Sequence, residues 1–303
     1  MKPNPNEFEP PTVDRLTQHL ADHPVVESSP WRGAMPLMLG GVVVMLLLMM
    51  VHPLLAVLPW LGLMGAMAWM AARLQRARAL HQQVTRAWEL AMLRHHRVAL
   101  RRAWELLPLV RPHAELHGRC VAIMAHVLDD LACYDSAMAA MDYLLQRLPD
   151  AHPLALMLRV QRVNCALCTD QLADADDALR KLRPTADTLP PGPIPAGYHL
   201  ARLVQDVRTG HYAEAIEHAD DTAKQLQPLG VHAGYGYGLL AFCHHELAQR
   251  SDDPGHANTQ RSAAQTLWHR ATLLVPPAAL CFRYRELAAL PQDANTAKPE
   301  GGA

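Results

Sequence analysis

The chain has 303 residues, half of them hydrophobic, so it is long enough to bury a substantial core. Its formal net charge is −1, which argues against a large basic surface for nucleic acid. Only four of the 28 basic residues are lysine, a bias that would suit a GC-rich bacterial genome. We therefore expect a folded, bacterial protein that does not bind nucleic acid.

Residues 1–33 form a polar, proline-containing segment that we expect to be a short cytosolic tail. The stretch from Thr12 to Ala21 has some helical periodicity, which Pro24 and Pro30 confine. A secretory signal would carry its apolar core near the chain start with a cleavage site after it. The hydrophobic run that follows the tail is therefore expected to be a membrane anchor.

Residues 34–72 contain no Asp, Glu, Lys or Arg, and Arg32 and Arg73 close the run on either side. As one straight helix the run would be roughly 58 Å long, about twice the ~30 Å hydrocarbon core of a bilayer. Because proline disfavours helix at the residue before it, His52-Pro53 divides the run into two segments. We expect a transmembrane helical hairpin of residues 34–51 and 54–72. A single span with a re-entrant or interfacial segment remains the alternative.

Arginines are concentrated directly after this hydrophobic run. Across residues 73–102 only Glu89 opposes Arg73, Arg76, Arg78, Arg86, Arg94, Arg97, Arg101 and Arg102. By the positive-inside rule, the tail and everything after Arg73 belong in the cytosol. We expect an integral protein of a bacterial cytoplasmic membrane, with Arg73, Arg76 and Arg78 contacting anionic lipid headgroups.

From residue 73 to residue 290 the hydrophobic pattern is helical throughout, and it repeats. The clearest unit runs from Thr209 to Ile216 (TGHYAEAI). A small residue occurs in the same register at Ala99, Ala137, Ala175 and Ala215, at spacings of 38, 38 and 40 residues. A fifth, Ala264, follows 49 residues later, and the excess matches an insertion from Gln249 to Asn258. We refer to these five residues as the key alanines.

Two other positions recur with the key alanines. In the preceding helix they are Ala87, Ala125, Val163, Leu203 and Ala241, and four residues after each key alanine come Ala103, Met141, Leu179, Ala219 and Trp268. The pattern resembles the tetratricopeptide repeat (TPR) superfamily, in which a Gly-x-Tyr-x-x-Ala turn joins two antiparallel helices. The resemblance implies an all-α chain: a transmembrane hairpin, then a TPR-like α-solenoid of about five helix pairs over residues 73–290, with residues 277–290 as a capping helix. Residues 291–303 are expected to be a disordered tail.

Two further stretches have a structural interpretation. Pro184, Pro190, Pro191, Pro193 and Pro195 predict an extended linker between the third and fourth repeats. The glycines between Gly234 and Gly238 alternate with tyrosines and follow no strand, so they do not form a phosphate loop. We expect them to let a neighbouring helix approach closely.

Candidate chemistry is sparse. Cys165 and Cys168 lie three residues apart without a second ligand pair, and the histidine doublets point in directions too different to share one ion. The acidic pairs accompany no nucleophile or phosphate loop. We expect no metal, no cofactor and no catalytic residue, and we interpret the chain as a non-enzyme.

The TPR resemblance implies a concave groove lined by the first helix of each repeat. Mapped onto this chain, the groove residues are Trp88, Arg119, His126, Asp129, Gln161, Asn164, Leu200, Val204, Tyr235, Phe242 and His245. Some of these positions could instead be buried between repeats. The expected function is a membrane-anchored TPR adaptor or scaffold whose partners are a protein or peptide client and membrane lipids. The alternative is a cofactor- or metal-handling protein of envelope biogenesis that uses the His and Cys residues.

Overall fold

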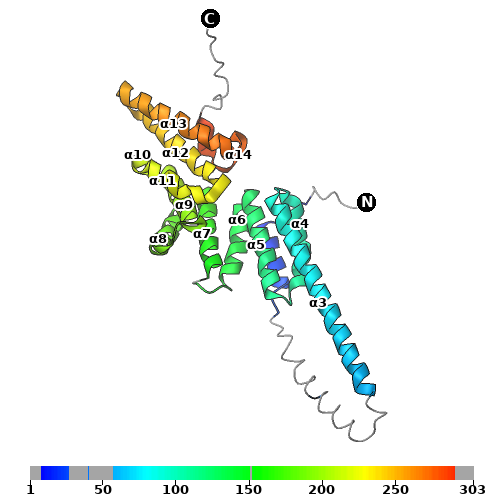
Figure 1. Ribbon diagram of the computed structural model, residues 1–303. Helices are drawn as coiled ribbons and strands as arrows, with labels where there is room; N and C mark the ends of the chain where they lie inside the picture. Colours follow the sequence, from blue (N-terminus) through cyan, green and yellow to red (C-terminus); the bar gives the residue numbers. More distant parts are fainter. Residues whose placement is uncertain (1–7, 27–39, 41–56, 151, 291–303) are drawn as a thin grey trace. The chain divides into compact units, whose positions relative to one another are not determined.

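The computed structural model describes residues 8–26, 40, 57–150 and 152–290 (Figure 1). Within these ranges every regular element is helical and no strand occurs, which confirms the all-α prediction. The chain divides into two compact units, residues 1–131 and 132–303. The predicted first span, residue 40 excepted, and the predicted C-terminal tail lie outside the described residues.

The first unit contains four described helices. They are α1 (Val13–Asp22), α3 (Val57–Met92), α4 (His96–Val110) and α5 (Ala114–Asp130). Helix α3 packs against α4 and α5, and α4 packs against α5. Because α3 continues without a break through Arg73, no linker separates the end of the hydrophobic run from the first helix pair.

Over the part of the chain that the structure describes, no helix has both the length and the apolar character needed to cross a membrane.

Helix α1 is docked within the first unit. Its Leu16 and Leu20 are fully buried, and the His19 ring stacks on Trp104 of α4 with 3.7 Å between ring centroids. From α5, the buried His117 places Nε2 2.9 Å from the His23 carbonyl oxygen. The segment expected as a polar tail thus contributes a packed helix.

The second unit begins with α6 and ends with a short 3-10 helix. Its elements are α6 (Tyr134–Leu145), α7 (Pro153–Cys168), α8 (Leu172–Thr188), α9 (Pro193–Thr209), α10 (Tyr212–Glu217), α11 (Ala219–Leu226), η3 (Gln227–His232), α12 (Ala233–Arg250), α13 (Pro254–Leu274), α14 (Pro277–Arg283) and η4 (Arg285–Ala289). Helix α7 packs on α6, α8 and α9, α9 packs on α12, and α12 packs along α13. Each helix therefore contacts chiefly its neighbours in the chain.

One turn recurs at four helix junctions. Arg94, Ala132, Asp170 and Gly210 all adopt the left-handed conformation, with φ between 57° and 78°. The residue after each begins the next helix with φ from −81° to −88° and ψ from 53° to 59°. Four residues further on, the amide of the key alanine donates to the carbonyl of that capping residue over 2.9 to 3.1 Å. The sequence register thus corresponds to one backbone geometry, repeated four times.

The register also matches the pattern of burial. The key alanines are at most 6 % exposed, and the recurring residues of the preceding helices (Ala87, Ala125, Val163, Leu203 and Ala241) are all buried. Small buried side chains at these points let two helix backbones approach closely. The repeated positions of the sequence therefore lie in the core.

Three of the four turns place a residue with a Cβ in the left-handed conformation, which costs roughly 1–2 kcal/mol relative to glycine. Glycine removes this cost but gives the unfolded chain more conformational entropy, which offsets part of the gain. We therefore expect Ala132→Gly to stabilise the protein by about 0.5–1 kcal/mol. Ala79→Gly at an exposed position inside α3 is the control and should instead cost about 1 kcal/mol. Denaturant titrations of both variants measure the change in the free energy of unfolding. A change of the same sign in the two variants would contradict the prediction.

The repeat pattern is interrupted in two places. In the fourth pair the second helix breaks at His218, whose φ of −124° and ψ of 38° separate α10 from α11. In the last pair the insertion lengthens the helices, because α12 extends to Arg250 and α13 begins at Pro254.

The predicted extended proline linker is wrong. Pro184 lies inside α8, Pro193 and Pro195 lie in the first turn of α9, and only residues 189–192 connect the two helices. Proline is favourable in a first helical turn because the amide it lacks would have no intrahelical acceptor there.

Ion pairs attach the C-terminal segment to the rest of the second unit. The side chain of Arg208, almost buried, contacts Asp170 and lies 2.7 Å from Glu286 of η4. Arg285 also pairs with Asp170 at 3.1 Å. Residues 277–290 therefore form α14 and η4, which pack on α12, where the sequence predicted one capping helix.

Candidate functional site

Four predicted groove residues lie in the first unit. The rings of Trp88 on α3 and His126 on α5 are 5.6 Å apart, and Trp88 is 43 % exposed. Arg119 is exposed and pairs with Glu115 at 2.8 Å, while Asp129 is buried. The structure thus brings Trp88 and His126 together.

The carboxylate of Asp130, which is not one of the predicted groove residues, connects this pair to α4. Asp130 Oδ2 lies 3.7 Å from His126 Nε2 and 3.6 Å from His96 Nδ1. Burial lowers the pKa of His96, and the nearby Asp130 charge opposes that shift. The cluster favours a neutral His96 within a structural network. In the sequence these residues belong to two doublets, His95-His96 and Asp129-Asp130. The distance between the doublets along the chain does not predict that their side chains come together.

The other seven predicted groove residues lie in the second unit. Four of them are buried, namely Asn164, Leu200, Val204 and Phe242. The other three, Gln161, Tyr235 and His245, are partly exposed. Because α9 packs on both α7 and α12, the buried positions hold neighbouring helices together and are closed to a partner.

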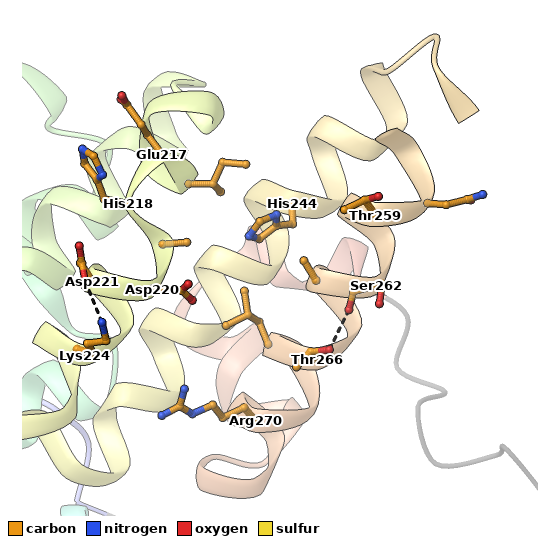
Figure 2. Close-up of a pocket in the computed structure, with 15 residues that line it drawn as sticks. Glu217, His218, Asp220, Asp221, Lys224, His244, Thr259, Ser262, Thr266 and Arg270 are labelled. Carbon is orange, nitrogen blue, oxygen red and sulfur yellow. Dashed lines mark hydrogen bonds and ion pairs between the residues drawn. The ribbon is translucent and has the colours of Figure 1, made fainter. Parts of the chain in front are cut away.

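A cleft of about 1150 Å³ lies elsewhere in the second unit, where both departures from the regular repeat meet (Figure 2). The broken helix α10–α11 forms one wall, the lengthened α13 forms the other, and α12 contributes His244 between them. The lining residues are Ile216, Glu217, His218, Ala219, Asp220, Asp221, Lys224, His244, Asn258, Thr259, Ser262, Ala263, Thr266, Leu267 and Arg270. None of the predicted groove residues lines it.

The cleft combines polar and apolar side chains, and its charges are unevenly paired. Lys224 Nζ lies 3.1 Å from Asp221 Oδ1, so these two charges offset each other. Within the described part of the chain, Glu217 and Asp220 have no ion-pair or hydrogen-bond partner. Arg270 lies over the Tyr237 ring, 4.2 Å from its centroid. Two carboxylates at one end therefore remain available to a ligand.

A smaller apolar hollow of about 260 Å³ adjoins the cleft at Arg270. It is lined by Gln227, Gly230, Ala233, Tyr237, Arg270, Leu273 and Leu274. We call the cleft and the hollow together the C-terminal groove.

The remaining predicted residues have simple surroundings. Arg73, Arg76 and Arg78 are exposed on α3, and the Arg73 guanidinium lies 5.4 Å from the centre of the Trp69 ring. Cys165 is buried and Cys168 is half-buried. Among the residues that the structure describes, no group of three or more His, Cys, Asp or Glu side chains is arranged to hold a metal ion.

Comparison of the chain with protein-family models, with curated proteins and with solved structures gave no match.

Proposed function

We propose that the chain is a membrane-anchored helical-repeat adaptor that binds a segment of a partner protein at the cytosolic face of a membrane. The observation that carries the proposal is the turn that recurs at Arg94, Ala132, Asp170 and Gly210, followed each time by a buried key alanine. Helix pairs stacked in this way share a continuous core and leave long surfaces on which other proteins bind. The TPR resemblance agrees with this use.

The membrane part of the proposal rests on the charge-free residues 34–72 and on the packing of α1. His19 of α1 stacks on Trp104 of α4, and His23, directly after α1, lies against His117 of α5, which supports one compartment for the segments before and after the hydrophobic run. Any chain that joins two such segments crosses a membrane an even number of times. This supports a two-pass hairpin over a single span, and the exposed Arg73, Arg76 and Arg78 suit anionic headgroups on the cytosolic side.

Protease protection tests the topology. With one epitope at each end of the full chain, we expect protease added to sealed spheroplasts to remove neither epitope. Protease added to inverted membrane vesicles should remove both. Removal of a single epitope in either preparation would contradict the two-pass anchor.

Proximity labelling tests the adaptor role. A labelling enzyme fused to the C-terminus of the full chain should enrich a small, reproducible set of proteins in the native host. The control is the same enzyme on an unrelated two-pass anchor. Identical protein sets from the two fusions would argue against an adaptor.

A further inference from the structure

The C-terminal groove is linear, because three helical elements pass through it in matching order. From the end of α10 through α11 to η3 the lining runs from Ile216 to Gly230, and along α13 it runs from Asn258 to Leu274. On the antiparallel α12 the order is reversed, with His244 in the cleft and Tyr237 in the hollow. One extended ligand could therefore contact both parts at once.

The two ends of the groove differ in charge. Glu217 and Asp220 lie at the cleft end, together with neutral polar side chains such as Thr259 and Ser262 (Figure 2). Arg270 lies at the junction with the hollow and would repel a cation placed there. A basic ligand therefore fits the groove in one register only, with its positive charges at the cleft end.

The hollow end offers apolar contact. Leu273 is 71 % exposed and Leu274 is 37 % exposed, and both border the hollow beside the Tyr237 ring. Exposed leucines beside a concave surface lose unfavourable contact with water when a large apolar side chain covers them.

We propose that the C-terminal groove binds a basic segment of a partner protein, with Lys or Arg side chains at Glu217 and Asp220 and a large apolar side chain in the hollow. The proposal rests on the adaptor function and names the chemistry of its partner. His244 and Tyr237 are seven positions apart on α12, roughly 10 Å along the helix axis. An extended peptide covers this distance in about three residues, which sets the spacing between its basic and apolar side chains.

Fluorescence polarisation with the full chain in detergent tests this. The probe is a labelled synthetic peptide with two adjacent arginines followed, three residues later, by leucine. We expect saturable binding that weakens as salt is raised, because the attraction between solvent-exposed charges is screened. The same peptide with glutamate in place of arginine should not bind.

Paired variants localise the binding. Glu217→Gln with Asp220→Asn should weaken it about five- to tenfold, through loss of two charge pairs. The matched control, Glu214→Gln with Asp252→Asn, removes two exposed carboxylates that do not line the groove and should leave affinity unchanged. At the apolar end, Leu273→Asn should weaken binding about fivefold. The control is Leu109→Asn, which changes another exposed leucine, on α4, and should leave binding unchanged.

Absence of peptide binding, or equal affinity for the groove and control variants, would overturn this inference. The adaptor proposal would stand in that case, provided that proximity labelling with the full chain still enriched specific proteins. Loss of that enrichment would remove the adaptor role independently of the peptide result.

Discussion

Gly234→Ala in α12 is expected to destabilise the protein by about 2 kcal/mol, although the same change inside most helices is favourable by up to about 1 kcal/mol. A Cβ at this position would lie 2.9 Å from Val275 Cγ2 and 3.1 Å from the carbonyl oxygen of Ala271. That oxygen already accepts a hydrogen bond from the Val275 amide at 2.9 Å, so it has little freedom to move. The added methyl group would push α13 away from α12.

Gly118→Ala in α5 is the matched control, because nothing lies within 4 Å of a Cβ added there. It should stabilise the protein by about 1 kcal/mol through helix propensity alone. Denaturant midpoints of the two variants measure the difference, and hydrogen exchange across residues 233–274 should show faster exchange for Gly234→Ala only. A stabilised Gly234→Ala variant would mean that α12 and α13 do not pack this closely.

Leu16→Ala combined with Leu20→Ala is expected to release α1 from the first unit. Both side chains are fully buried, and truncation of a buried leucine costs about 2–5 kcal/mol. The combined loss is comparable with the whole stability of a small unit, about 5–15 kcal/mol. Limited trypsin digestion should then cut rapidly at Arg15, which is protected while α1 is helical and docked.

Val13→Ala provides the control, since Val13 lies on the same helix but is 37 % exposed. Its digestion rate at Arg15 should match that of the unaltered chain. Equal protection of Arg15 in the double variant would show that α1 is not held by its leucines, and it would weaken the argument for a two-pass anchor.

The helix pairs could be predicted because their signal is local. The key alanines recur with one spacing, and the Gly210 turn has the residue types that a left-handed turn favours. The same turn at Arg94, Ala132 and Asp170 has no glycine, so the sequence gives no sign of its conformation. There the surrounding packing of the helices compensates for an unfavourable backbone geometry. The close approach expected at the glycines from Gly234 to Gly238 is confirmed.

The positions that depend on tertiary contacts could not be predicted. The short α1 lies between prolines, and its two buried leucines become informative only once α4 and α5 are in place. His117 is buried against the carbonyl oxygen of His23, a contact between residues 94 positions apart in the sequence. Asn164 on α7, Leu200 and Val204 on α9, and Phe242 on α12 are buried because α9 packs on both α7 and α12, and the register alone does not say which groove positions such contacts close.

The C-terminal groove arises where the chain departs from the regular repeat. Asp220 and Asp221 form one of the acidic pairs in the sequence, and the residues from Gln249 to Asn258 form the insertion. The break at His218 and the lengthening of α12 and α13 place the acidic pair on one wall of the cleft and Asn258, the last residue of the insertion, on the other. A sequence pattern identifies irregular stretches, but only the folded chain shows that two of them face each other.

Because helix α3 is unbroken, it fixes the angle between its two halves about the helix axis. Its charge-free first half and its packed second half, with Val84 and Ala87 buried, belong to one unbroken helix. Each residue inserted between Ala72 and Val84 would turn these halves by about 100° and separate them by about 1.5 Å. Four inserted residues would nearly restore the phase while lifting the helix pairs by about 6 Å. The length of this segment, counted in single residues, therefore sets the direction in which Val84 and Ala87 face relative to the charge-free first half of α3.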